Sequence, residues 1–256
     1  WRAVWRYDRG DADFIAAQRN FDATDGPSVD YLIRLADSRG DGRIYAGTRG
    51  NWGPTYKVGY VPVLHELSHN DADAIGFTFR TVQSLSTDIE ASFDETNLAE
   101  YETLNIKYVL VPTTRKPAVP ATLVESKGSH QLYEVKTSGY FQVVDRTGIV
   151  VADRTNLVAA NAEFRSSKSA LDNKYPAVAF EGGRAPAATV DTAALNGSPG
   201  EVVSQRNRRQ DGWFSAEVVT TRSATVLLKA SYDPRWTVKV DGKSARTIMM
   251  LSLIHI

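Results

Sequence analysis

One motif in the chain matches a known catalytic arrangement in both residue type and spacing. His65, Glu66 and His69 form the pattern H-E-x-x-H. On a helix, side chains four residues apart lie on the same face, so both imidazoles can point toward one zinc ion while the glutamate activates a zinc-bound water. The pattern therefore raises the hypothesis of a zinc peptidase, with the two histidines as ligands and Glu66 as the general base.

The surrounding sequence favours a different interpretation of this motif. Pro62 lies three residues before His65, which restricts the start of any helix to that point, and residues 70–73 are mostly polar, as at a helix end. The extended pattern lacks its third ligand, and only spacing marks Glu90 as a distal carboxylate. We therefore expect a short surface helix with solvated histidines and no bound metal. Two alternatives remain, the zinc site and a position of both histidines beside a ligand groove.

A second set of residues has the chemistry of a carbohydrate site. Such sites stack aromatic rings on the apolar faces of sugars and bind hydroxyl groups with carboxylates, amides and arginine. The segment 47–60 is rich in glycine and aromatic residues and predicts an irregular surface loop. The ligand-binding candidates selected on this basis are Asn51, Trp52, Tyr56, Tyr60, Asp73 and Arg80. The alternative is that these aromatic side chains pack in the core.

Composition narrows the classes of function. Hydrophobic residues make up 42% and charged residues 23%, as in a globular protein. Thirty basic and thirty acidic side chains cancel, which argues against nucleic acid as a partner. The chain has no cysteine, so disulfides, cysteine-zinc sites and thiol nucleophiles are excluded. No phosphate-binding or dinucleotide-binding glycine pattern occurs, and we expect no cofactor and no catalytic residue in this segment.

The hydrophobic patterns predict an α+β fold, with a mixed α/β domain at 1–174 followed by an incomplete antiparallel β-sandwich module at 175–250. An amphipathic helix is indicated by apolar residues at i, i+3, i+4 and i+7, namely Val29, Leu32, Ile33 and Ala36. The apolar run 106–111 predicts a buried central strand. Segments 131–135 and 140–144 are predicted to pair as an antiparallel hairpin.

The β-module ends in a predicted hairpin within the segment SYDPRWTVKVDGKSA, residues 231–245. Alternation places Trp236, Val238 and Val240 on one face of a half-buried strand. Asp241-Gly242 is a strong turn signal, because glycine accepts the positive φ of a primed turn. Trp213 and Trp236 are expected in the core of the module.

The amino-acid sequence of this hairpin resembles the C-terminal extracytoplasmic region of YfhO-type bacterial membrane proteins. Segments 42–47 (GRIYAG), 73–79 (DAIGFTF) and 101–110 (YETLNIKYVL) are similar to the same proteins, in the same order. The resemblance implies a multi-spanning membrane protein that transfers sugar from a polyprenyl-linked donor. It places this region at the extracytoplasmic face, as a non-catalytic part that assists transfer to a cell-envelope glycan or polymer.

The partners that follow from the resemblance are a transmembrane region of the same chain, which the segment lacks, and a glycan or lipid-linked sugar. The alternative is a freestanding carbohydrate-binding or adhesion module.

Both ends of the chain suggest truncation. The sequence begins at Trp1 without an initiator methionine, and residues 251–256 (LSLIHI) resemble a translated sequencing adapter. We therefore expect the natural protein to continue past Met250 and the β-module to be cut short. A cut would leave an unpaired strand edge beside residues 247–250.

Overall fold

The computed structural model describes residues 2–40, 42–76, 89–153, 155–180, 196–231, 233 and 235–251, and side chains from residue 9 onward. Helices and strands in several sheets confirm the predicted α+β fold class, and antiparallel strand pairs follow the mixed N-terminal part. The ligand-binding candidate Arg80 falls outside the described residues.

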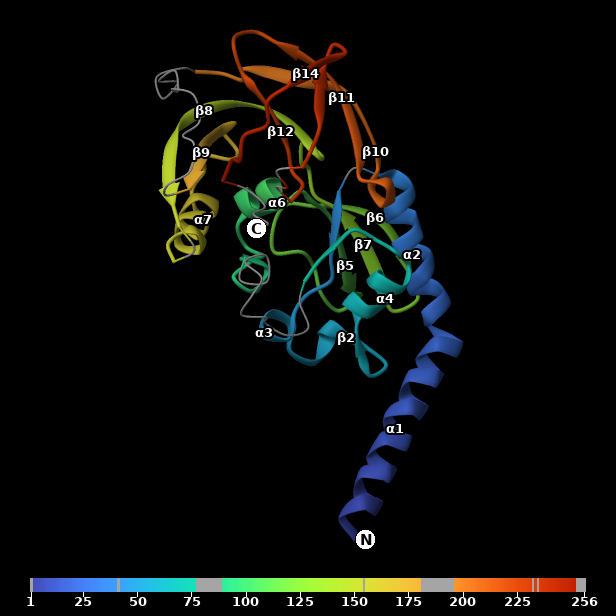
Figure 1. Cartoon of the computed structure of the whole chain (residues 1–256). Coiled ribbons are helices and arrows are strands. Elements are labelled where there is room, and N and C mark those ends of the chain that lie inside the picture. Colours follow the sequence, from blue (N-terminus) through green and yellow to red (C-terminus); the bar gives the residue numbers. More distant parts are fainter. Residues whose placement is uncertain are drawn as a thin grey trace. The chain divides into compact units, whose positions relative to one another are not determined.

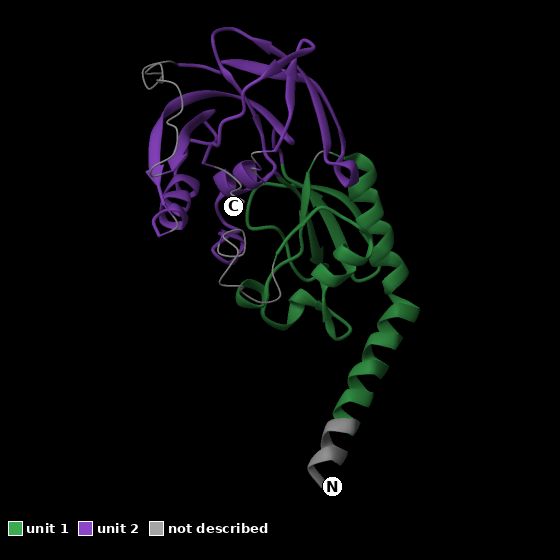
Figure 2. Ribbon diagram, viewed as in Figure 1, with its two compact units in different colours: residues 1–79, 106–135 green, residues 80–105, 136–256 purple. Residues whose placement is uncertain are grey.

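The chain divides into two compact units whose segments alternate along the sequence (Figure 2). Unit 1 consists of residues 1–79 and 106–135, and unit 2 of residues 80–105 and 136–256. The predicted division at 174/175 falls inside unit 2. The chain leaves unit 1, forms the first part of unit 2, and then returns to unit 1 with the strand that begins at Ile106.

Unit 1 contains a five-stranded sheet in the order β4-β1-β5-β7-β6. Its strands are β1 (Arg43–Tyr45), β4 (Ala74–Ile75), β5 (Ile106–Pro112), β6 (Thr122–Lys127) and β7 (His130–Glu134). The first three strands of that order run parallel, and β7 and β6 run antiparallel to their neighbours. The apolar run at 106–111 occupies the middle strand and is almost wholly buried, as predicted.

Helices and a short hairpin complete unit 1. Their bounds are α1 (Arg2–Thr24), α2 (Gly26–Arg39), α3 (Arg49–Trp52), η1 (Gly53–Tyr56), β2 (Lys57–Val58), β3 (Val61–Pro62) and α4 (Val63–His69). Helix α2 packs on strands β5, β6 and β7 (Figure 1). Its predicted stripe is confirmed, because Val29, Leu32, Ile33 and Ala36 are all buried in the core. Tyr108 contributes to the same core from β5.

The described part of unit 2 contains helices and several groups of strands. Its described elements are α6 (Leu98–Leu104), β8 (Phe141–Ala152), α7 (Leu157–Ser166), β9 (Lys174–Phe180), β10 (Gly200–Arg208), η2 (Arg209–Asp211), β11 (Trp213–Thr220), β12 (Thr225–Leu228), β13 (Val238–Val240) and β14 (Lys243–Ala245). Strands β12, β8 and β9 form one sheet, in which β8 and β9 are parallel. The pairs β10–β11 and β13–β14 are antiparallel.

The predicted pairing of segments 131–135 and 140–144 is wrong. Strand β7 pairs with β5 and β6 in unit 1, whereas β8 pairs with β9 and β12 in unit 2. The connection between β7 and β8 does not form a tight hairpin turn. Instead, Ser138 bonds to the Glu102 carboxylate through its backbone N–H, and the Gln205 amide donates to the Ser138 carbonyl. The residues in these contacts are far apart in sequence. The local alternation of apolar and polar residues therefore does not predict the contacts.

The C-terminal hairpin forms as predicted, but its burial differs. Asp241 and Gly242 both have positive φ, at 50° and 77°, as a primed turn requires. Val238 and Val240 are 39% and 57% exposed, so these two side chains are not part of a core. Trp213 is also exposed, against the prediction that it lies in the core.

The segment after the hairpin is hydrogen-bonded, contrary to the unpaired edge expected beside residues 247–250. The Val178 N–H donates to the Met249 carbonyl, and the Leu251 N–H donates to the Pro176 carbonyl. Met250 forms an isolated antiparallel bridge with Ala177. This segment therefore lies against β9 and covers part of its edge.

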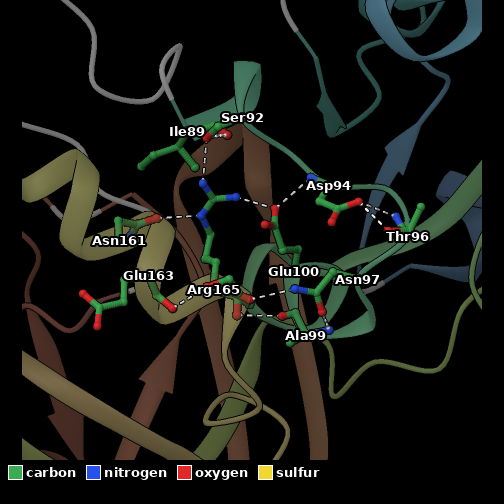
Figure 3. Close-up of polar contacts among 12 residues, drawn as sticks. Ile89, Ser92, Asp94, Thr96, Asn97, Ala99, Glu100, Asn161, Glu163 and Arg165 are labelled. Carbon is green, nitrogen blue, oxygen red and sulfur yellow. Dashed lines mark hydrogen bonds and ion pairs between the residues drawn. The ribbon is translucent and has the colours of Figure 1, made fainter.

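A buried ion pair joins the two helices of unit 2 (Figure 3). The Arg165 guanidinium on α7 donates to the Glu100 carboxylate on α6, to Asn161 Oδ1 at 2.7 Å and to Ser92 Oγ at 2.8 Å. Arg165 is 1% exposed, so each of these bonds compensates for a loss of hydration. The cluster has a structural role in holding α6 against α7.

A search of the described helices for an apolar stretch long enough to cross a membrane finds none.

Candidate functional site

The H-E-x-x-H motif lies on α4, which has the bounds that the sequence predicts, Val63–His69. His65 and His69 are both exposed, while Val63 and Leu67 are buried. Glu66 is directed toward α1, because its Oε1 lies 3.5 Å from Gln18 Nε2. Partial burial raises the pKa of the Glu66 carboxyl, and the nearby Asp22 and Asp30 carboxylates raise it further.

These contacts bear on the zinc hypothesis. Among the described residues, no group of three or more histidine, aspartate or glutamate side chains is arranged to hold a metal ion. The two exposed histidines supply two imidazoles, whereas a catalytic zinc site uses three protein ligands. Metal analysis of the purified chain tests this alternative, and stoichiometric zinc that disappears in His65→Ala would support it.

Trp52, selected as a sugar-stacking candidate, is a buried residue of unit 1. It is 4% exposed and meets the Tyr45 ring edge-on, with the ring centroids 5.5 Å apart. Asn51 is exposed, and its Nδ2 donates to Tyr45 Oη at 3.0 Å. The Trp52 ring therefore has no free face for a sugar, and its role is to hold the loop on β1.

The backbone at Gly47 makes this position of the indole possible. Gly47 has φ of +77°, a conformation that residues with a Cβ rarely adopt. A Cβ at this position would lie 2.1 Å from a carbon of the Trp52 ring. The glycine after β1 thus allows the indole to lie directly against the backbone, which explains why the loop folds back over the strand end.

Arg115 completes this arrangement, although no sequence pattern marks it as a candidate. Its guanidinium lies over the Trp52 ring, 5.0 Å from the centroid, within the range of a cation–π interaction. Arg115 follows the end of β5, and Trp52 follows the end of β1, the parallel neighbour of β5. The neighbouring ends of β1 and β5 are the feature that would identify Arg115 as a partner of Trp52. That feature becomes visible only when the order of the strands in the sheet is known.

Tyr60 belongs to a different surface, formed by α1 and the β2–β3 hairpin. Its ring stacks on Phe14 with centroids 3.8 Å apart and an interplanar angle of 15°. Lys57 Nζ lies 4.5 Å from the Tyr60 centroid and 5.8 Å from that of Tyr56. We call Phe14, Lys57 and Tyr60 the Phe14–Tyr60 surface. The sequence pattern selects Tyr60 at this surface and not Phe14, which lies more than forty residues earlier in the chain.

Gln18 fixes the hairpin to the helix at this surface. Its Oε1 accepts hydrogen bonds from the backbone N–H groups of Tyr60 at 2.8 Å and Val61 at 3.3 Å. Phe14 and Gln18 are four residues apart on α1, so they lie on the same face. Phe14 and Tyr60 cover one face of each other's ring, and the two residues remain 40% and 41% exposed.

The remaining candidates do not join either group. Asp73 forms an ion pair with Arg43, with Oδ1 3.4 Å from Nε, at the amino ends of β4 and β1. Asn51 and Trp52 follow the carboxyl end of β1, so the structure places Asp73 at the opposite end of the strands from them. Arg80 lies outside the described residues. The six predicted residues therefore do not form one site.

Comparisons of this chain with family models, with curated proteins and with solved structures find no match.

The geometry supports ligand contact at the Phe14–Tyr60 surface. Exposed aromatic rings suit the apolar faces of sugars, and Lys57 supplies a polar group beside them. Catalysis by nucleophile, base and orienting group requires those groups to meet at one place. No such set lies at this surface among the described residues.

Proposed function

We propose that this chain is a non-catalytic, glycan-contacting region of a YfhO-type, glycosyltransferase-like bacterial membrane protein, located at the extracytoplasmic face. In this role it engages a cell-envelope glycan or polymer that receives sugar from a polyprenyl-linked donor. The transmembrane part of the same protein is its partner.

The family part of the proposal is supported by where the similar segments lie. Segment 42–47 contains β1, segment 73–79 contains β4, and segment 101–110 contains most of β5. These strands are neighbours in the order β4-β1-β5 and run parallel. The three similar segments are spread over about seventy residues of sequence, yet they form adjacent strands of one sheet. This is expected if the segments are similar because they form the same sheet in both proteins.

The observation that carries the glycan role is the stacked and exposed pair of Phe14 and Tyr60. The two rings stack face to face, about 40% of each residue remains exposed, and Lys57 Nζ lies over the Tyr60 ring. Neutral sugars are bound by this combination of ring faces and polar groups.

Glycan binding by the purified chain tests this role. The probe is an array of neutral bacterial cell-envelope saccharides, followed by calorimetric titration of those that bind. We expect Phe14→Ala and Tyr60→Ala each to weaken binding by about tenfold, equivalent to about 1.4 kcal/mol. Tyr31→Ala is the matched control, because Tyr31 is an aromatic side chain of α2 with the same 40% exposure.

Two results would contradict the glycan role. One is a chain that binds none of the saccharides on the array. The other is binding that Phe14→Ala and Tyr60→Ala leave at the level of the Tyr31→Ala control.

The membrane part of the proposal has a separate test. Sequencing the genomic DNA on both sides of this coding segment gives the complete reading frame. We expect several hydrophobic spans upstream in the same frame. A signal sequence shortly upstream, with no such spans, would favour the freestanding carbohydrate-binding module instead.

A further inference from the structure

The carboxyl ends of β1 and β5 bring two loops of unit 1 to the same edge of the sheet. Strands β1 and β5 are parallel neighbours, so the chain leaves both at that edge. The loop after β1 contains α3, and the loop after β5 begins at Thr113. Ligands of sheets with parallel strands bind outside the carboxyl ends of the strands, because loops from neighbouring strands converge there.

Both loops are positively charged. Residues 46–65 and 113–124 contain no aspartate or glutamate, although acidic and basic residues are equal in number over the whole chain. The cations closest in sequence to the two strand ends are Arg49, Arg115 and Lys116. Arg49 and Lys116 are exposed, and Arg115 is partly buried. Positive charge on loops that contain no acidic residue of their own attracts an anion.

Arg115 is held in place without an acidic partner. Its guanidinium lies 5.0 Å from the centre of the Trp52 ring, and its backbone N–H donates to the Pro112 carbonyl at 2.8 Å. Within the part of the chain that the structure describes, no carboxylate pairs with it. Stacking on an indole leaves the edge of a guanidinium, with its N–H groups, available to bind two oxygens of one anion.

Two hydroxyl groups lie next to this arginine in sequence. Thr113 and Thr114 are exposed, and the Thr113 N–H donates to the Ser129 carbonyl at 2.8 Å, which anchors the loop to the start of β7. Threonine hydroxyls and arginine forks are the donors that bind phosphate oxygens. The loop therefore contains the guanidinium of Arg115 and, next to it in sequence, two hydroxyl groups that can donate hydrogen bonds.

We propose that this edge of unit 1 binds a phosphate ester. Arg115 binds two phosphate oxygens, Arg49 and Lys116 supply further positive charge, and the hydroxyls of Thr113 and Thr114 donate hydrogen bonds. We call these five residues the Arg115 site. The site does not depend on the glycan role, because it uses none of the residues of the Phe14–Tyr60 surface.

Isothermal titration of the purified chain with inorganic pyrophosphate tests the site. We expect Arg115→Gln to weaken binding at least about tenfold, because charge-assisted bidentate pairs are strong. Arg34→Gln is the matched control, since Arg34 is an exposed arginine of α2 in the same unit, and it should leave binding unchanged. Circular dichroism spectra and thermal melts of each variant establish that it is folded.

Arg115→Lys separates charge from geometry. It keeps the positive charge and loses the planar fork, so we expect affinity between that of the wild type and that of Arg115→Gln. Equal affinity for pyrophosphate in the wild type, Arg115→Gln and Arg34→Gln, together with no Arg115-dependent binding of a phosphate ester, would overturn the proposal. A loss of the same size in Arg34→Gln and Arg115→Gln would overturn it as well, because it would show non-specific attraction.

Two further probes distinguish the sources of the phosphate. The first is cosedimentation with phosphatidylcholine vesicles that contain phosphatidic acid, and the second is titration with glucose 1-phosphate. Binding to either probe that depends on Arg115 supports the site, and the tighter of the two assigns the source as lipid-linked or soluble. Absence of Arg115-dependent binding to both probes and to pyrophosphate would overturn it. Neutral saccharides report on the Phe14–Tyr60 surface, so failure of one proposal leaves the other measurable.

Discussion

Glu102 and Lys229 form a buried ion pair that joins segments of unit 2 more than a hundred residues apart in sequence. Lys229 Nζ lies 2.5 Å from Glu102 Oε1 and 2.7 Å from Ser138 Oγ. Ser138 in turn donates to the same carboxylate oxygen at 2.6 Å. Lys229 is fully buried, and Glu102 is 8% exposed. The three side chains therefore connect α6, the segment before β8 and the end of β12.

Loss of the lysine should strongly destabilise the protein. Lys229→Met keeps most of the apolar stem but leaves the Glu102 carboxylate buried without its cation, which costs about 3–5 kcal/mol. Chemical denaturation gives the free energy of unfolding. The double variant Lys229→Met with Glu102→Gln should recover a large part of the loss, because no charge is then buried alone. A double variant as unstable as the single one would show that the lysine acts through packing.

The close approach of Gly47 and Trp52 predicts a second effect. Gly47→Ala adds a Cβ that overlaps the indole and also strains a backbone with φ of +77°. We expect a loss of about 2–4 kcal/mol, together with a change in the near-ultraviolet circular dichroism as Trp52 moves. Gly53→Ala is the control, because Gly53 has φ of +56° and open space around its Cβ position, so it carries the backbone cost alone. Equal losses would mean that the indole contact contributes nothing.

The start of α6 offers a third prediction. Asn97 Oδ1 accepts from the Ala99 N–H at 3.0 Å, and Nδ2 donates to the Arg165 carbonyl at 3.1 Å, near the end of α7 (Figure 3). Asn97→Ala removes both bonds and should cost about 1–2 kcal/mol, as other lost helix caps do. Asn97→Asp keeps the cap acceptor but places a charge beside the carbonyl end of α7, so it should remain destabilised. Thermal melts compare the two variants, and wild-type stability in Asn97→Asp would assign the whole effect to the cap.

The patterns that the sequence predicted well are those set by local periodicity. The stripe on α2, the bounds of α4, the middle strand β5 and the Asp241-Gly242 turn all follow from spacing or from the backbone preference of one residue. In each case a short segment contains the whole signal. The structure at these positions therefore agrees with the expectation from the residues alone.

The errors arise where a contact depends on a segment far along the chain. Strand β7 was paired with the wrong neighbour because the true neighbours, β5 and β6, are defined by sheet order. Trp52 is a ligand candidate by residue type, whereas its contact with Arg115, from the loop after β5, follows from the sheet order. Arg115 and Phe14 were missed for the same reason, since their partners are about sixty and forty residues away.

The burial of His130 predicts that stability depends on pH. Its Nδ1 lies 2.8 Å from Ser129 Oγ and 3.7 Å from Asp25 Oδ2, and its Nε2 has no hydrogen-bond partner among the described residues. Burial lowers the pKa of His130, and the nearby Asp25 carboxylate opposes this shift. The unfolded state, where the pKa is the ordinary value of about 6.5, therefore binds the proton more readily than the folded state.

The sign of the effect follows from this difference. The contribution of His130 is fully present above about pH 6.5 and is lost as the pH falls below it, with a slope of at most about 1.4 kcal/mol per pH unit. Glu66 acts in the opposite direction, because its raised pKa makes the folded state bind more protons, so its contribution is lost as the pH rises. A variant at His130 retains Glu66, so the contribution of Glu66 cancels when the unfolding free energies of the wild type and that variant are subtracted.

Urea denaturation of the wild type and of His130→Gln at pH 7.5, 6.5 and 5.5 measures the effect directly. Gln does not titrate in this range, so the unfolding free energy of the wild type minus that of the variant should fall as the pH is lowered. A wild-type-minus-His130→Gln difference that is constant across the three pH values would show that the histidine is protonated equally in the folded and unfolded states.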